Sequence, residues 1–185
     1  MSKSFIDNAC TAIFFVLLIQ FAFAHSNRVF LNEKLPCKTF TLYLHDTLFN
    51  VTNADNATSS AVTNATGISN FQFGTLIVFD DPLTLDQHIL SSPVARAQGF
   101  FFYDMKTRYN AWFAFSVIFN SSDYVGTLNL MGADMMNQKT RDISVVGGTG
   151  DFFMTRGIAT LKTDAAQGFA YFRLKMDIKL YECYY

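Results

Sequence analysis

The chain has 185 residues, of which half are hydrophobic, and it is rich in aromatic side chains, with 21 Phe and 8 Tyr. Its formal charge is −1 and it contains no run of Lys or Arg, which argues against nucleic acid and acidic membrane surfaces as partners. This length allows one domain with a sizeable core, and the aromatic content suits both that core and a flat aromatic ligand.

The N-terminus predicts a secretory signal peptide. Residues 13–24 are almost purely apolar, and residues 22–24 read Ala-Phe-Ala, an A-x-A cleavage site. The apolar run is too short to be a convincing membrane span. We therefore expect a signal peptide at 1–24, a loose arm at 25–36 and one folded domain at 37–185, in a protein that is secreted and soluble.

Cleavage would remove Cys10 and leave two cysteines, Cys37 near the start of the domain and Cys183 near its end. An even number of cysteines in an oxidising compartment favours a disulfide. Such a bridge would tie the first strand to the last, and closing so long a loop could stabilise the fold by ~4–5 kcal/mol at most. The alternative is a pair of independent buried thiols.

Four N-glycosylation sequons agree with secretion, although each alone is a weak signal. Three of them lie in the polar stretch 50–70, which we interpret as a loop. The four acceptors are Asn50, Asn56, Asn64 and Asn120.

Short apolar runs with period-two alternation predict eight β-strands, and no segment has the periodicity of an amphipathic helix. The acidic pair before Pro82, Asp80 and Asp81, is interpreted as turn chemistry between two of these strands. The predicted strands are residues 39–49, 74–79, 94–103, 112–119, 126–131, 140–146, 152–161 and 168–183.

The glycine-rich segment 147–150 follows a strand and allows two readings. A strand that runs into Gly-Gly-x-Gly resembles the start of a dinucleotide-binding unit, but that unit needs a helix next. Residues 151–163 lack apolar residues at helical spacing. We therefore predict a hairpin between antiparallel strands, and no bound cofactor.

The last strand has the clearest pattern, with Phe172, Leu174 and Met176 on one face and charged residues on the other. Eight such strands, with the first joined to the last by the expected disulfide, favour an all-β fold. We predict an eight-stranded antiparallel β-barrel whose lumen can hold one small ligand. Residues 112–119 are apolar on both faces, so we expect a homo-oligomer interface there or nearby.

Two aspartates each end an apolar row of a predicted strand: Asp46 follows Leu42 and Leu44, and Asp134 follows Leu128 and Leu130. At the mouth of an apolar cavity such a carboxyl would have a raised pKa, which suits general acid or base work. From the residues alone, a solvent-exposed cap at a strand end is the favoured alternative.

Other catalytic and metal chemistry finds little support. Arg141 begins a strand and could orient a carboxylate or a phenolate, or equally form a surface ion pair. His45 and Asp46 are adjacent, so period two places them on opposite faces rather than in a triad. A G-x-S-x-G motif is missing, and the scattered histidines predict no metal site.

Several segments spread over the mature chain form a recognisable combination. They are Leu44-His45-Asp46, Asn56-Ala57-Thr58-Ser59, Phe79-Asp80-Asp81-Pro82-Leu83-Thr84, Val94-Ala95-Arg96-Ala97-Gln98-Gly99-Phe100, Gly132-Ala133-Asp134, residues 141–157 and Tyr181-Glu182-Cys183-Tyr184. Taken together, these segments resemble the plant dirigent proteins.

This resemblance implies an eight-stranded barrel, usually trimeric, that is secreted to the apoplast of the plant cell wall. It also implies a function: the capture of coniferyl alcohol radicals, made by a separate laccase or peroxidase, and control of the face on which two of them couple. Parts of the sequence look most like members that direct (−)-pinoresinol formation, in which positioning supplies the selectivity and no cofactor is needed.

The resemblance also implies site residues. Asp46 and Asp134 match the family's pocket carboxylates, which would assist closure of the coupled intermediate as acid and base. One position departs from the pattern, because this chain has Phe101 where pinoresinol-forming members often have Tyr. The pocket-lining positions are Phe101, Tyr103, Arg141, Thr163 and Phe172.

Two rival functions remain open at this point. One is an enzyme proper, a cyclase or dehydratase that acts on a flavonoid-type phenol in the same pocket. The other is a binding or structural protein that stores an apolar ligand or organises lignin deposition.

Overall fold

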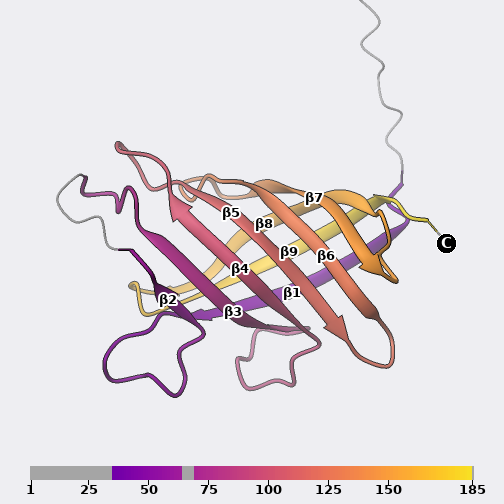
Figure 1. The fold of residues 1–185 in the computed structure, drawn as a ribbon, viewed down its shortest axis with the longest axis horizontal. Coiled ribbons are helices and arrows are strands. Elements are labelled where there is room, and N and C mark those ends of the chain that lie inside the picture. Colours follow the sequence, from indigo (N-terminus) through magenta and orange to yellow (C-terminus); the bar gives the residue numbers. More distant parts are fainter. Residues whose placement is uncertain (1–34, 64–68, 185) are drawn as a thin grey trace, which may run out of the picture. The chain divides into compact units, whose positions relative to one another are not determined.

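The computed structural model describes residues 35–63 and 69–184 (Figure 1). The predicted signal peptide, all but the last two residues of the predicted arm, and the sequon at Asn64 lie outside these ranges. The other three acceptors, Asn50, Asn56 and Asn120, are exposed on the surface. Within the described ranges there is no helix that could cross a membrane.

The described chain consists of strands and connecting loops, and eight long strands correspond to the eight predicted ones. A ninth, β2, is a three-residue strand that sequence analysis had placed inside a loop. The strands are β1 (Lys38–Thr47), β2 (Ser59–Ala61), β3 (Leu76–Thr84), β4 (Ala95–Tyr103), β5 (Ala111–Asn120), β6 (Val125–Asp134), β7 (Arg141–Gly150), β8 (Arg156–Gln167) and β9 (Tyr171–Glu182).

The strands form one antiparallel sheet in the order β1-β9-β8-β7-β6-β5-β4-β3-β2. β1 also pairs with β3, through Tyr43 with Thr84 and Leu44 with Leu83, and this pairing closes the sheet on itself. The predicted all-β, eight-stranded antiparallel barrel is therefore confirmed. Closure removes the free edges that would otherwise be available for unwanted pairing.

Alternating side chains fill the inside of the barrel, as the sequence pattern predicts. In β9 the residues Leu174, Met176, Ile178 and Leu180 are buried, while the residues between them are partly or fully exposed. Burial of this apolar face is the main stabilising contribution expected for such a fold, at roughly 25 cal/mol per Å² of apolar surface.

The interpretation of residues 80–82 as a turn is wrong, because all three lie within β3. The backbone N–H of Asp80 donates to the carbonyl of Thr58, so it points away from β4. Alternate residues of a strand point the same way, and Pro82 therefore turns its nitrogen away from β4 too and breaks no bond in that ladder. The turn comes later, where the Asp86 carboxylate accepts from the His88 N–H (2.8 Å).

The glycine-rich segment 147–150 does belong to a hairpin of antiparallel strands, but its residues lie in β7 and the turn is made by residues 151–155. A Cβ at residue 148 would lie 2.3 Å from the carbonyl oxygen of Phe152, so close packing of backbone requires glycine there. A turn and a strand follow the segment, not a helix, which removes the basis for a dinucleotide site.

One end of the barrel is filled by aromatic rings, and we call these four residues the aromatic plug: Phe40, Phe119, Tyr124 and Phe152. The rings of Phe119 and Phe152 are 4.8 Å apart, and Phe40 contacts the other three at 5.5–5.9 Å. At the same end Cys37 and Cys183 form the predicted disulfide, which joins the start of β1 to the end of β9 (Figure 1, right).

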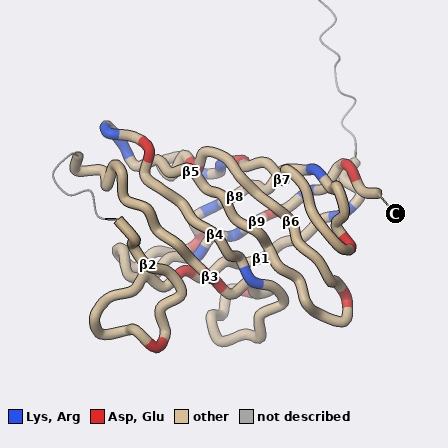
Figure 2. Tube along the Cα trace, in the orientation of Figure 1, with Lys and Arg blue, Asp and Glu red and all other residues tan. Residues whose placement is uncertain are grey.

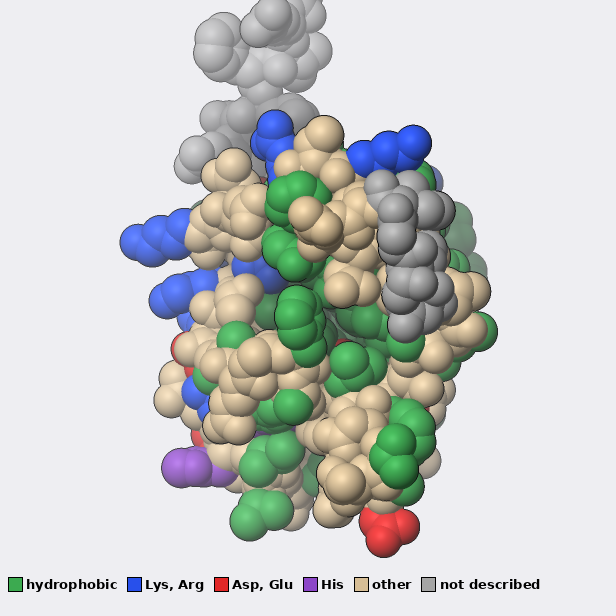
Figure 3. Space-filling model, turned by 90° about the vertical axis from the view of Figure 1, so that its left-hand side faces the viewer, with side chains coloured by type: hydrophobic (Ala, Val, Ile, Leu, Met, Phe, Trp, Pro, Cys, Tyr) green, Lys and Arg blue, Asp and Glu red, His purple; other side chains and the backbone are tan. Residues whose placement is uncertain are grey.

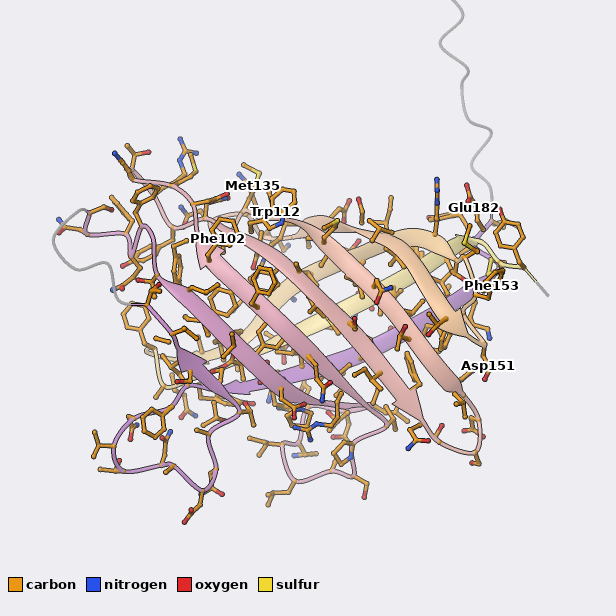
Figure 4. All side chains as sticks on the ribbon, in the orientation of Figure 1. Phe102, Trp112, Met135, Asp151, Phe153 and Glu182 are labelled. Atoms are coloured by element: carbon orange, nitrogen blue, oxygen red, sulfur yellow. A yellow bond between two sulfur atoms is a disulfide. The ribbon has the colours of Figure 1, made fainter. Side chains whose placement is uncertain are left out.

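Part of the outer surface of β4, β5 and β6 is apolar, whereas the neighbouring row of Gln98, Ser116 and Asn129 is polar. Phe102 lies opposite Trp112, and Phe100 opposite Ala114 and then Met131 in the next strand. Figure 4 shows Phe102 and Trp112 projecting from the outside of the barrel. β5 contains no charged residue, and Figure 2 shows the middle of this face almost without charge.

Candidate functional site

A cavity of about 450 Å³ occupies the end of the barrel opposite the aromatic plug. Figure 3 looks onto this end and shows hydrophobic side chains gathered around a hollow. The volume lies within the range typical of small-molecule sites. The cavity brings together all seven residues that sequence analysis assigned to the site: Asp46, Phe101, Tyr103, Asp134, Arg141, Thr163 and Phe172.

Asp46 lies near the end of β1, where its register partner is Phe172 of β9. Its side chain is fully buried, and one carboxyl oxygen accepts a hydrogen bond from the Ser59 hydroxyl while the other has no partner. Burial raises the pKa of Asp46 to about 6, although the Ser59 hydrogen bond acts in the opposite direction. With no cation bonded to it, Asp46 can carry a proton at mildly acidic pH.

Asp134 lies at the end of β6 and is paired with a cation. Arg141, the first residue of β7, donates from Nε to one carboxyl oxygen and from Nη2 to the other (3.4 Å). Its Nη1 donates to Thr163 Oγ1 at 3.0 Å. Burial raises the pKa of Asp134, and the guanidinium acts against that rise. The pairing favours an ionised carboxylate, in contrast to Asp46.

Aromatic rings line the rest of the cavity. Phe101 stacks on Phe113 with ring centroids 4.9 Å apart, and it lies edge-on to Tyr103 at 5.8 Å. Burial, followed by the neighbouring Tyr109, Asp46 and Asp134, raises the pKa of Tyr103 to about 12. The Tyr103 hydroxyl therefore stays protonated and can donate a hydrogen bond, whereas Phe101 offers none.

The structure corrects two interpretations: the exposed caps that the residues favoured, and the surface ion pair that they left as an equal alternative for Arg141. Asp46 and Asp134 are not solvent-exposed caps, because at most 1% of each residue is exposed. Arg141 forms an ion pair, but a buried one beside the cavity and not on the surface. As predicted, His45 lies on the opposite face of β1 from Asp46, where it bonds to Thr84 (2.8 Å) and Tyr171 (2.9 Å).

Sequence analysis missed two residues near Asp46. Ser59 belongs to β2, which is too short to leave a pattern in the sequence. Asp81 is buried in β3, in the inward row that also contains Ile77, Phe79 and Leu83. Extending the period-two pattern of β3 past Asp80 would have found it.

The described residues contain no cluster of three or more His, Cys, Asp or Glu side chains with a geometry for metal binding. The polar groups that line the cavity are two carboxyls, a guanidinium, hydroxyls and the amide of Gln72. This set can donate and accept protons and can orient phenolic oxygens.

Comparisons with known proteins converge on one family. The family model described as "Dirigent-like protein" matches residues 37–181. Dirigent protein 5 of Arabidopsis thaliana is 62% identical over 153 residues, which is 83% of this chain and 84% of that one. A dirigent protein of Sinopodophyllum hexandrum is 49% identical over 177 residues, 92% of each chain.

Among solved structures, that of the pterocarpan synthase dirigent protein PsPTS1 is similar, with a TM-score of 0.71 and 25% identity. The alignment covers 80% of this chain and 96% of that one.

Proposed function

The chain belongs to the dirigent family, and from that premise we propose that it directs the stereoselective 8–8′ coupling of two coniferyl alcohol radicals to an optically active lignan, pinoresinol, with a preference for the (−) form. A separate laccase or peroxidase would supply the radicals. Two radicals held in preset orientation couple without further assistance, so the cavity supplies selectivity by positioning.

The observation that carries this proposal is the presence, within one aromatic cavity, of two buried carboxyls with different hydrogen-bond partners. Asp46 has no cation bonded to it and a pKa raised to about 6, whereas Asp134 is held by Arg141. Pairs of titratable groups whose surroundings differ in this way divide naturally into an acid and a base.

Coupling yields a bis-quinone methide that must cyclise. In the proposed step the Asp46 carboxyl gives its proton to a quinone methide oxygen, which becomes a phenol. A side-chain hydroxyl of the same dimer then adds to the electrophilic carbon, and the Asp134 carboxylate accepts its proton. This step closes one ring and leaves the proton on Asp134. The second ring closes in the same way with the roles of the two aspartates exchanged, so that both return to their starting states and the net number of protons is unchanged. Tyr103 can donate a hydrogen bond to a phenolic oxygen during these steps.

A second candidate is a cyclase or dehydratase that acts on a flavonoid-type phenol. The similarity to pterocarpan synthase dirigent proteins favours this alternative, and the same acid and base would serve it. Incubation with an isoflavanol in one arm, and with coniferyl alcohol plus a non-selective oxidant in the other, separates the two activities.

We further propose that the protein is a trimer in the extracellular space of the plant cell wall. The apolar outer face of β4, β5 and β6 supports self-association, because Phe100, Trp112 and Met131 are each at least 37% exposed in one chain. Exposed sequons at Asn50 and Asn56 are consistent with secretion.

The test is the chiral product ratio from coniferyl alcohol and a non-selective oxidant, with oxidant-only controls. Asp46→Asn and Asp134→Asn should each keep the fold but lose enantiomeric excess or divert the intermediate to open products. Loss of a proton-transfer group typically costs on the order of 10²–10⁴-fold, enough for uncatalysed racemic closure to compete.

Asp177→Asn is the matched control, because Asp177 lies on the outer face of β9 and bonds to Thr41 and Lys175. It should leave the product ratio unchanged. An unchanged enantiomeric excess in both single variants and in the double variant would show that shape alone directs the coupling.

A further inference from the structure

Asp81 is a buried carboxyl to which the proposed chemistry gives no role. It is 1% exposed and does not line the cavity. The nearby Thr58 hydroxyl is engaged with the backbone of Thr47 and His45. Within the described ranges, three buried side-chain polar atoms have no hydrogen-bond partner, and all three belong to two carboxyls: Oδ2 of Asp46 and both oxygens of Asp81.

The strand register brings these two carboxyls to the same place. β1 and β3 pair at Tyr43 with Thr84 and at Leu44 with Leu83. Two residues further along, the same register would set Asp46 opposite Asp81, and directly opposite residues share a face.

The two strands part at this point because the segment that ends in Ser59 enters between them. Thr58 N–H donates to the Thr47 carbonyl on one side, and the Thr58 carbonyl accepts from Asp80 N–H on the other. Asp46 and Asp81 thus face inward on the two sides of a fork in the barrel wall, with Asp46 toward the cavity.

Among the residues that the structure describes, no cation is hydrogen-bonded to this pair, although the charge of Arg96 acts on Asp81 from the outer face. Arg96 of β4 is bonded to Asp80 on the outer face, Arg141 of β7 is bonded to Asp134, and Arg173 of β9 is bonded to Asp164. The other titratable groups nearby are His45 on the outer face of β1 and Tyr103 of β4, while β2 contributes only hydroxyls. Burial, and then the neighbouring Asp46 carboxylate, raise the pKa of Asp81 well above its ordinary value.

We propose that Asp81 is a positioning residue that stays protonated and donates a hydrogen bond to Oδ2 of Asp46, and so sets the acidity of Asp46 for the proposed proton transfer. When Asp46 gives up its proton, the resulting carboxylate would accept from Ser59 on one oxygen and from Asp81 on the other. Asp81 exchanges no proton with the substrate and acts through Asp46 alone. The role in proton transfer rests on the proposed function, whereas the hydrogen bond between the two carboxyls does not.

Two substitutions separate a hydrogen-bond donor from a space-filling side chain. Asp81→Asn keeps the shape and a donor, whereas Asp81→Leu removes the donor and extends the apolar row of Ile77, Phe79 and Leu83. The apolar replacement removes an unsatisfied buried group, so the barrel should tolerate it. Asp80→Asn on the outer face is the matched control.

The first measurement is the titration of Asp46 in the free protein, by NMR of carbon-13-labelled aspartate. Asp81→Leu should raise the pKa of Asp46 by ~1–2 units, because a hydrogen bond to a charged group is lost. In Asp81→Asn the pKa of Asp46 should stay close to the wild-type value, because the amide still donates, and in Asp80→Asn it should be unchanged. An equal shift in Asp81→Asn and Asp81→Leu, or no shift in Asp81→Leu, overturns the proposal.

Infrared spectroscopy of the wild-type protein and Asp81→Asn gives a second readout that does not need the Leu variant to fold. The wild type should show a protonated carboxyl band that persists above neutral pH and is absent from Asp81→Asn. If that band is missing from the wild type, Asp81 is not the neutral donor and the proposal fails.

The pH profile of enantiomeric excess then tests the link to function. Because the working acid is neutral Asp46, selectivity should fall as pH rises through its pKa, and the fall should move to higher pH in Asp81→Leu. If the pKa of Asp46 shifts as expected but the pH profile of enantiomeric excess is the same in Asp81→Leu as in the wild type, the hydrogen bond from Asp81 is supported. The proposed role of Asp46 as the acid is then contradicted.

Discussion

The two ends of the barrel are built by the same strands but filled in opposite ways. At one end the aromatic plug fills the lumen, and the Cys37–Cys183 disulfide ties the first and last long strands. At the other end aromatic rings line a cavity of about 450 Å³ instead of filling it. Ionisable groups concentrate at the hollow end, where Asp46, Asp81 and Asp134 are all buried.

This difference shows how the fold separates stability from chemistry. Buried aromatic rings in mutual contact stabilise a domain by several kcal/mol each, whereas a buried carboxyl without a partner costs free energy. The plugged end therefore offsets the unfavourable arrangement that the cavity end needs if its carboxyls are to exchange protons. Substitutions at the plugged end should change stability, and substitutions at the cavity end should change product ratio or pH dependence.

The largest expected effect is on the plug. Phe152 is almost fully buried against Phe40, Phe119 and Tyr124, so Phe152→Ala should lower the free energy of unfolding by ~3–5 kcal/mol. Denaturant unfolding measures this change. Its neighbour Phe153 is 61% exposed, and Phe153→Ala should change stability by less than ~0.5 kcal/mol.

The same pair of variants tests whether stability at the plugged end is independent of product selectivity at the cavity end. The product ratio of folded Phe152→Ala should equal that of the wild type, because the plug lies at the end opposite the cavity. A stable variant with altered enantiomeric excess would show that the two ends are coupled and would break the comparison.

A smaller effect is expected at the cavity end and depends on pH. The pKa of Asp46 is about 6 in the folded protein and 3.8 as its ordinary value. The folded state therefore binds the Asp46 proton more tightly than the unfolded state does. The stability that this proton binding contributes is fully present below pH 3.8 and is lost as pH rises through 6. Between pH 4 and pH 7 the wild type should lose on the order of 2–3 kcal/mol relative to Asp46→Asn.

The difference between the two proteins cancels the titrating groups that do not interact with Asp46, and it includes any change in the neighbouring Asp81 carboxyl. Burial lowers the pKa of His45, so its contribution is lost as pH falls, but both proteins contain it. Asp177 gives a comparison of opposite sign. Hydrogen bonds from Lys175 and Thr41 lower the pKa of Asp177 despite partial burial, so the wild type should lose stability relative to Asp177→Asn as pH falls, not as it rises. Parallel stability curves for the wild type and Asp46→Asn would contradict the assignment.

Much of the barrel could be predicted because its strands alternate cleanly. In β9, burial follows the parity of the sequence, and parity also placed Asp46 and Asp134 at the ends of inward rows. Parity cannot decide whether a residue at a strand end faces solvent or a cavity, because that depends on which other strands surround it. For this reason the residues alone predicted a lumen that could hold a ligand but favoured exposed caps, and the family resemblance assigned both carboxyls to the pocket.

The errors at residues 80–82 and at Ser59 have a common physical origin. In both places strand pairing between distant parts of the chain overrides what the local sequence indicates. Asp80, Asp81 and Pro82 have the composition of a turn, but at the closing seam a proline can face away from the β4 ladder. β2 pairs along only three residues, from Ser59 to Ala61, and exists because the seam leaves β3 partly unpaired. Ser59 and Asp81 were missed for these reasons, although both lie beside Asp46.

The smallest expected effect sharpens the comparison within the cavity. Phe101 lines the cavity and stacks on Phe113, but its ring has no hydroxyl to offer a ligand. Phe101→Tyr would add a donor two residues from Tyr103, on the same face of β4. The buried hydroxyl should cost about 1 kcal/mol or less of stability if the cavity hydrates it or a ligand binds it. The enantiomer ratio should change by up to about tenfold, because a difference of ~1.4 kcal/mol in transition-state free energy has that effect.

Chiral chromatography of the products measures this change, and Phe102→Tyr is the control. Phe102 lies on the same strand but projects from the outer surface (Figure 4), so a hydroxyl there cannot reach the cavity. A ratio that changes in Phe101→Tyr alone assigns part of the stereocontrol to hydrogen bonding at this wall. An unchanged ratio with an unchanged fold would instead mean that Asp46, Asp134 and the shape of the ring-lined wall determine the handedness, and that the phenylalanine at position 101 contributes by packing alone.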